Sequence, residues 1–212
     1  MEVIDAIRNY AGQPITRQLL MDLLRDYRRP YDKISELVKQ NILTQIKRGV
    51  FIPGPQLSVQ VPENLLLANH LWGPSYVSSD SALSYWGLIP ERVYETLSMT
   101  TNTAKTYKTP VGRFRYIRLP LPYYSFGLQR VELATKQMTL IACKEKSLCD
   151  KIVTTQGLKL RSVKQSREFL MDDLRISSDS LKELNTQEIK GYLKDAPKQD
   201  SISILIKTLN DL

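Results

Sequence analysis

Side chains that suit contacts with double-stranded DNA gather around one predicted helix near the N-terminus. Arginine and lysine read guanine edges, serine reads several bases, and flanking cations hold phosphates. The candidates precede or line the helix predicted for residues 30–40, or lie at the tip of the following hairpin: Arg28, Arg29, Tyr31, Lys33, Ser35, Lys39, Lys47 and Arg48. A solvated helix face is the alternative, because Asp32 and Glu36 dilute the positive field there. Tyr31 also fits the edge of the core, since it shares a side with Ile34.

A second basic region lies in the middle of the chain and contains a single acid, Glu95. Its cations are Arg92, Lys105, Lys108, Arg113, Arg115 and Arg118. Arg113 and Arg115 alternate with Phe114 and Tyr116, so we expect the two arginines on one face of a strand. Two interpretations stay open. The region is a surface for DNA, RNA or an acidic protein partner, or it is a solvated outer face of a sheet.

Catalytic chemistry finds little support among the residues. His70 is the one histidine, no serine nucleophile turn stands near it, and no glycine-rich phosphate loop occurs. Cys143 and Cys149 match no zinc spacing and are expected to be reduced packing residues. A metal-dependent nuclease using Glu145 and Asp150 is the catalytic alternative, but the adjacent lysines favour solvated acid–base pairs on a helix. We therefore expect a protein that is not an enzyme and has no cofactor or metal.

The elements that would position the first set of candidates form a short N-terminal pattern. Apolar residues at helical spacing predict a helix over 2–10, a second helix capped by Thr16, and a third helix begun by Pro30. Alternating residues over 42–52, broken at Gly49, predict a hairpin. Three helices followed by a hairpin is the order of a winged helix-turn-helix, and we assign one to residues 1–55.

A proline-containing linker separates this unit from a longer one, which we assign to residues 63–212. Helices are predicted over 63–71, from Ser78 or Ser79 to about 87, and over 144–154, 162–174, 178–184, 186–193 and 202–209. Strands are predicted over 93–101 and 112–119, with a hairpin over 131–142 and a polar connection over 105–112. The predicted fold class is α+β, a winged helix-turn-helix followed by a mixed α/β domain with an antiparallel sheet and C-terminal helices.

Composition agrees with these expectations. The 212 residues carry a net charge of +8, and the isoelectric point is near 9.4. Such a basic balance favours polyanionic partners without identifying one. No apolar run reaches the length of a membrane helix, and the first residues do not resemble a signal peptide. We therefore expect a cytoplasmic location and no membrane partner.

Several motifs follow one another along the chain. The hairpin tip 47–51 (KRGVF) is followed by 74–78 (PSYVS), 81–83 (SAL), 87–91 (GLIPE), the threonine-rich 98–101, 110–116 (PVGRFRY) and 143–151 (CKEKSLCDK). In these stretches the chain resembles AbiEi-type antitoxins, which regulate type IV abortive-infection toxin–antitoxin systems. Ser147 departs from the small residue usual in the last motif, and the resemblance ends near Gly157.

This resemblance implies a regulator that binds inverted repeats in the promoter of its own operon and represses it. It also implies an antitoxin role against a nucleotidyltransferase-like toxin, without a stable complex between the two proteins. Our hypothesis is therefore a transcriptional regulator whose partners are double-stranded operator DNA and a cognate toxin. The rival hypotheses are a nucleic-acid-processing enzyme and a winged-helix module that docks protein.

Overall fold

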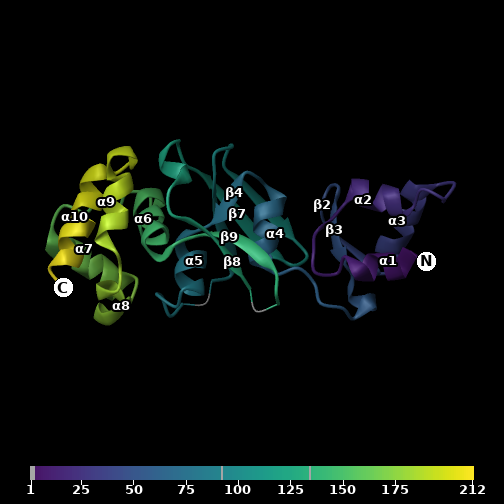
Figure 1. Cartoon of the computed structure of the whole chain (residues 1–212), viewed down its shortest axis with the longest axis horizontal. Helices are drawn as coiled ribbons and strands as arrows, with labels where there is room; N and C mark the ends of the chain where they lie inside the picture. Colours follow the sequence, from purple (N-terminus) through teal and green to yellow (C-terminus); the bar gives the residue numbers. More distant parts are fainter. Residues whose placement is uncertain (1–2, 92, 134) are drawn as a thin grey trace.

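The computed structural model of the chain describes residues 3–91, 93–133 and 135–212. Three parts follow one another along its longest axis (Figure 1). A small N-terminal unit occupies one end, a six-stranded sheet with its helices lies in the middle, and a group of helices forms the C-terminal end. The described residues thus form a mixed α and β structure with two sheets.

The N-terminal unit has the order helix, strand, helix, helix, strand, strand. Its elements are α1 (Val3–Asn9), β1 (Ile15–Thr16), α2 (Arg17–Leu23), α3 (Pro30–Lys39), β2 (Leu43–Lys47) and β3 (Val50–Pro53). The hydroxyl of Thr16 accepts a hydrogen bond from the Leu19 amide and caps α2, as predicted. The three short strands pair in the order β1-β3-β2. Their one shared core contains Ile7, Leu20 and Leu37, so the helices and the sheet stabilise one another.

The connection to the middle part is short. A 3-10 turn, η1 (Pro55–Leu57), follows β3, and α4 (Asn64–Leu71) begins the next part. The central sheet has the order β6-β7-β5-β4-β9-β8. Its strands are β4 (Ser75–Val77), β5 (Glu95–Thr100), β6 (Lys105–Thr109), β7 (Gly112–Arg118), β8 (Leu128–Glu132) and β9 (Met138–Ala142).

This sheet is mixed rather than purely antiparallel. The pairs β4·β9 and β5·β7 are parallel, whereas β4·β5, β6·β7 and β8·β9 are antiparallel. The segment over 105–112, predicted to be a polar connection, contains β6 and turns into β7 at Pro110 and Val111. It was missed because an edge strand that faces solvent on most positions needs few apolar residues.

Each face of the sheet is covered by helices. One face packs Phe114, Tyr116 and Ile141 against α4, and the Tyr116 hydroxyl donates to the Ala68 carbonyl at 2.7 Å. The other face packs residues such as Met99 against α6 (Lys144–Thr154), beside which lies α5 (Ser79–Tyr85). The observed α6 has the predicted bounds. A 3-10 turn, η2 (Tyr123–Ser125), links β7 to β8.

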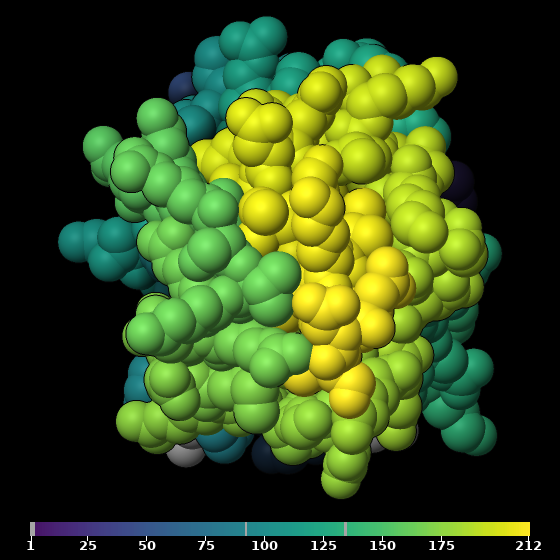
Figure 2. Space-filling model, turned by 90° about the vertical axis from the view of Figure 1, so that its left-hand side faces the viewer, coloured from purple at the N-terminus to yellow at the C-terminus, as the bar shows by residue number. Residues whose placement is uncertain are grey.

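The C-terminal helices pack against α6 on the side away from the sheet (Figure 1). They are α7 (Val163–Arg167), a π-helical turn η3 (Glu168–Asp173), α8 (Ser178–Lys182), α9 (Thr186–Tyr192), the 3-10 turn η4 (Leu193–Asp195) and α10 (Gln199–Asn210). Figure 2 faces this end of the molecule, which these helices largely cover. Their apolar residues continue the core of the sheet, so the part without a recognisable motif is structurally integral.

The N-terminal unit is docked on the middle part through apolar contacts. Ile46 of β2 and Ile52 of β3 are both buried in a cluster that also contains Leu71 of α4 and Phe114 of β7. The predicted linker prolines therefore connect two units that share a core. Among the described residues, no helix combines the length and the apolar character needed to cross a bilayer.

Candidate nucleic-acid interface

The helix α3 presents most of the predicted DNA-binding side chains on its solvent face. Ile34 and Leu37 are buried against the N-terminal core, which fixes the orientation of the helix. The opposite face and the preceding turn expose Arg28, Arg29, Tyr31, Ser35 and Lys39. Tyr31 is 59% exposed, so its alternative placement at the edge of the core is wrong.

Ion pairs reduce the positive charge of this face. Lys33 donates to Glu36 at 3.0 Å, and its ammonium lies 5.9 Å from the centre of the Tyr27 ring. Arg29 lies 3.8 Å from Asp32. Arg28 and Lys39 form no ion pair with any described residue, so these two carry the unneutralised charge of the α3 region.

The two cations predicted at the hairpin tip have different environments. Arg48 lies in the turn between β2 and β3 and is exposed. Lys47 instead donates to the Leu71 carbonyl at 2.7 Å, and its ammonium lies 5.6 Å from the Trp72 ring centre and 5.3 Å from that of Tyr107. Lys47 therefore joins the N-terminal unit to the middle part and is held away from a ligand.

The second basic region is divided between two faces of the sheet. Arg113 and Arg115 share one face of β7, as predicted, and the strand register adds Lys108 to it. Lys105 lies opposite Tyr116 and therefore belongs to the other face, together with Arg118. The ammonium of Lys105 is 4.6 Å from the Trp72 ring centre. Arg92 lies outside the described residues.

Glu95 neutralises part of the first of these faces. Its carboxylate lies 2.6 Å from Arg113 and 3.9 Å from Arg115, because β5 pairs in parallel with β7. The five predicted residues, Lys105, Lys108, Arg113, Arg115 and Arg118, are all exposed. They do not, however, all lie on one face of the sheet.

The motif 143–151 contains a buried ion pair. The sequence had instead predicted solvated acid–base pairs in this helix. Lys146 and Asp150 are fully buried, one helical turn apart on α6, with Nζ and Oδ1 separated by 2.9 Å. The other carboxylate oxygen accepts hydrogen bonds from the hydroxyls of Tyr76 and Ser78 at 2.9 and 2.7 Å. The lysine also donates to the Tyr123 carbonyl at 2.9 Å.

Burial determines the proton affinities in this polar centre. Desolvation lowers the pKa of Lys146, while the Asp150 carboxylate opposes that change. Desolvation, reinforced by the charge of Asp150, raises the pKa of Tyr76 and Tyr123. Both phenols therefore stay protonated, and that of Tyr76 donates its hydrogen bond to Asp150. The charges of Lys146 and Asp150 are thus matched by each other and by neutral hydrogen-bonding groups, whereas the buried Tyr123 hydroxyl has no hydrogen-bond partner among the described residues.

The two carboxylates of the nuclease hypothesis are directed to different places. Asp150 is engaged with Lys146, whereas Glu145 accepts a hydrogen bond from the Asn185 amide at 2.9 Å and links α6 to α9. Among the described residues no group of potential metal ligands contains both. The geometry therefore gives the nuclease hypothesis no shared metal position.

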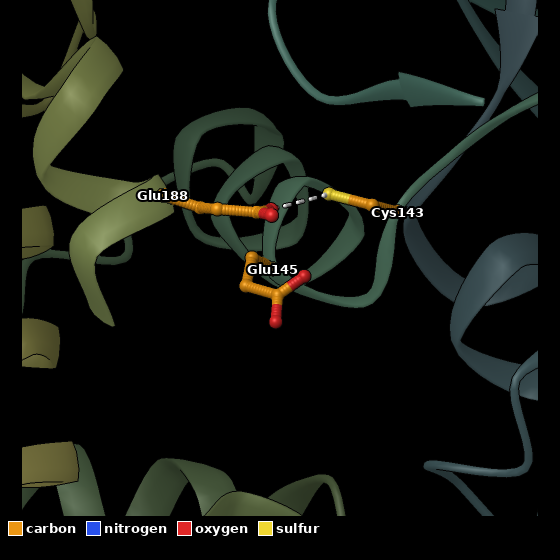
Figure 3. A group of neighbouring side chains, drawn as sticks. All are labelled: Cys143, Glu145 and Glu188. Atoms are coloured by element: carbon orange, nitrogen blue, oxygen red, sulfur yellow. Dashed lines mark hydrogen bonds between the residues drawn. The ribbon is translucent and has the colours of Figure 1, made fainter. Parts of the chain in front are cut away.

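A different set of side chains could hold a metal ion. Ligand atoms of Cys143, Glu145 and Glu188 lie within 4.8 Å of one another, and the Cys143 thiol donates a weak hydrogen bond to Glu188 at 3.8 Å (Figure 3). Burial raises the pKa of Cys143 to about 12, so the thiol is protonated at neutral pH. Sequence spacing could not reveal this group, because Glu188 reaches it from α9, far along the chain. Both cysteines are free, as predicted, and both are buried.

The chain matches no protein-family model and no curated protein. Function is therefore inferred from the arrangement of the chain's own residues and from the motif resemblance.

Proposed function

We propose that the protein is a DNA-binding transcriptional regulator whose N-terminal unit is a winged helix-turn-helix. The order helix, strand, helix, helix, strand, strand supports this assignment, with β2 and β3 as the wing. In a helix-turn-helix the second helix of the pair enters the major groove, and residues near its N-terminus contact base edges. The corresponding helix here is α3.

The observation that carries the proposal is the accessible face of α3. The helix lies at the end of the molecule away from the central sheet (Figure 1), so the middle part does not obstruct it. Tyr31, Lys33 and Ser35 are the candidates for base contacts. Arg28, Lys39 and Arg48 are the candidates for phosphate contacts, because each is exposed and carries a charge without an ion-pair partner among the described residues.

The biological role follows from the resemblance to AbiEi-type antitoxins. We propose that the protein acts in the cytoplasm, represses its own operon through inverted repeats, and opposes a cognate nucleotidyltransferase-like toxin. The motifs behind that resemblance lie mainly in the middle part, between 74 and 151, which separates the toxin-directed role from the DNA-binding unit.

A gel-shift titration tests DNA binding. The purified full chain is titrated against the DNA upstream of its own gene and against a scrambled duplex of equal length, with salt varied. We expect selective binding whose affinity falls steeply with salt. Replacing Arg28 and Lys39 by Gln should reduce the logarithmic salt slope by about 0.9 for each phosphate interaction that the substitution removes. The control, with Lys190 and Lys207 replaced by Gln, has the same net charge but alters the far end of the molecule.

Equal weakening by the two double variants would overturn the assignment of the α3 face. Equal affinity for both duplexes would mean that the basic charge binds DNA without selecting a sequence. Absence of DNA binding at low salt would leave the protein-docking hypothesis in its place. The toxin-directed role has a separate test, co-expression with the neighbouring toxin gene, in which growth rescue by the Arg28 and Lys39 double variant and by the native protein should be equal.

A further inference from the structure

A cleft of about 600 Å³ opens where the sheet edge meets the ends of two helices. Its sheet wall comes from β6 and β7, and its helical wall comes from the start of α5 and the end of α6. The side chains that matter for a ligand are Ser79, Asp80, Thr106, Arg115, Lys151 and Thr155. The volume lies in the range typical of small-molecule sites, roughly 300–1,000 Å³.

Positive charge predominates in this cleft. Its described lining residues include Lys105, Arg115 and Lys151 against one acid, Asp80. Lys105 is drawn to the Trp72 ring, and so Arg115 and Lys151 are the cations that can face a ligand. Asp80 fixes Lys151 at 2.7 Å, whereas Arg115 lies 3.9 Å from Glu95, which is bound more closely by Arg113. Arg115 is therefore the cation most available to an anion.

Ser79 supplies an unused polar group in the same place. The residue is only 1% exposed, yet its hydroxyl makes no hydrogen bond with any described residue. Its backbone adopts the left-handed conformation, with φ of 51°, at the first residue of α5, two positions after the end of β4. The hydroxyl is not among the fully buried side-chain atoms that lack a hydrogen-bond partner, and the residue lines the cleft, so the hydroxyl is open to an oxygen of a bound ligand.

The end of α6 does not oppose an anion here. The last carbonyls of a helix carry partial negative charge. The ammonium of Lys198 donates to the carbonyls of Ile152, Thr155 and Leu158 at 2.9, 2.7 and 2.9 Å. This cation offsets the negative end of the helix dipole behind the cleft.

We propose that this cleft binds a small phosphate-bearing ligand of about mononucleotide size. Arg115 and Lys151 pair with the phosphate, and Ser79 donates to one of its oxygens. The site is distinct from the α3 face, and its ligand can be measured on the free protein. The DNA titration and this binding test therefore succeed or fail separately.

Isothermal titration of the full chain with AMP, adenosine and inorganic phosphate tests the proposal. AMP should bind at least about tenfold more tightly than adenosine, because a hydrogen-bonded charge contributes that much. Arg115→Gln should weaken AMP by about tenfold, and Ser79→Ala should weaken it several-fold. The matched control is Arg130→Gln, which removes an exposed arginine from β8 at the opposite edge of the sheet and should bind AMP as the native protein does.

Three results would overturn the proposal. They are no heat from AMP or phosphate at millimolar concentration, equal affinities for AMP and adenosine, and equal losses in Arg115→Gln and Arg130→Gln. Circular dichroism of each variant confirms that it is folded. If Arg115→Gln does not fold, the AMP affinity of Ser79→Ala tests the proposal by itself. This substitution removes one oxygen and leaves every charge in place.

Discussion

At the scale of single residues, Lys146 and Asp150 hold opposite charges in a region without solvent contact. Each has its charge matched by the other and by neutral donors or acceptors from Tyr76, Ser78 and Tyr123. Loss of one partner leaves the other buried and uncompensated, which is far more costly than loss of an exposed pair. The pair thus makes the start of α6 intolerant of single changes.

Lys146→Met should lower the free energy of unfolding by about 3–5 kcal/mol, because Asp150 is left as an isolated buried charge. Lys144→Met is the matched control on the same helix, since Lys144 pairs with Glu183 near the surface. It should cost no more than about 1 kcal/mol. Urea denaturation of both variants measures the difference. Similar losses in the two would show that the buried pair has no special weight.

The buried thiol of Cys143 predicts a dependence of stability on pH. Its pKa is about 12 in the folded chain against an ordinary value of 9.0, so the folded state keeps a proton that the unfolded state releases. The stabilisation that the protonated Cys143 thiol contributes is fully present below pH 9.0 and is lost as the pH rises toward 12. The limiting slope is about 1.4 kcal/mol per pH unit.

Cys143→Ser removes this titration but keeps a side chain that can cap α6. Urea midpoints at about pH 8 and about pH 9.5, below the ordinary range of tyrosine, should therefore fall less in the variant than in the native protein. An equal fall in both proteins would contradict the assignment to Cys143. The other groups of the polar centre are common to both proteins and do not affect the comparison.

At the scale of elements, the approach of β8 to the start of α6 depends on Gly127. It has φ of 64°, and an added Cβ would lie 2.6 Å from the Cβ of Lys146 and 3.1 Å from the Cys143 sulfur. Gly87 has a similar φ of 69°, but an added Cβ there meets nothing within 4 Å. Alanine substitutions at the two glycines therefore distinguish the cost of the left-handed backbone from the cost of steric crowding.

Gly87→Ala should cost only the left-handed conformation, about 1–2 kcal/mol. Gly127→Ala should cost a further 1–3 kcal/mol or so, because the added methyl group forces β8 and α6 apart. Thermal and urea unfolding of both variants provide the comparison. Equal destabilisation would mean that the strand moves away from the helix without loss of packing.

The sequence predicted elements best where periodic apolar residues coincide with end signals. The bounds of α6 agree with the prediction, and α3 begins at Pro30 as expected. The strand β6 was missed because its lysines and threonines alternate without an apolar face of their own. Its only apolar anchor is Tyr107, which packs beside Trp72 and Tyr116.

Side-chain environments that depend on distant segments were less predictable. Lys146 and Asp150 have the spacing of an ordinary surface pair, and only the residues brought by β4 and η2 make the site polar enough to bury them. Lys47 has the position of a hairpin-tip cation, but Trp72 and Tyr107 of the middle part provide its partners. The α3 face was predictable because a single amphipathic helix determines it.

At the scale of the whole molecule, the N-terminal unit and the middle part share a core through Ile46 and Ile52. We expect the native protein to unfold in one calorimetric transition, because neither part can lose its core alone. Ile46→Asp places an unpaired charge in that shared cluster and should cost at least about 3 kcal/mol. The N-terminal unit should then melt separately at a lower temperature.

The control for this prediction is Gln45→Asp, the neighbouring residue of β2, whose side chain is exposed. It should leave a single transition close to the native temperature. Two transitions already present in the native protein would contradict the shared core. A single, merely shifted transition in Ile46→Asp would show that the two parts remain coupled without the apolar side chain at this position.

The contact between the N-terminal unit and the middle part, made by Lys47, Trp72, Ile46 and Ile52, has a consequence for the movement of the two parts. Because buried apolar side chains and the anchored Lys47 ammonium join the N-terminal unit to the middle part, we expect the two parts to keep a fixed orientation relative to each other. A ligand bound at α3 would therefore also determine the direction in which the C-terminal helices face. A partner that contacts those helices would in turn restrict the orientation of α3.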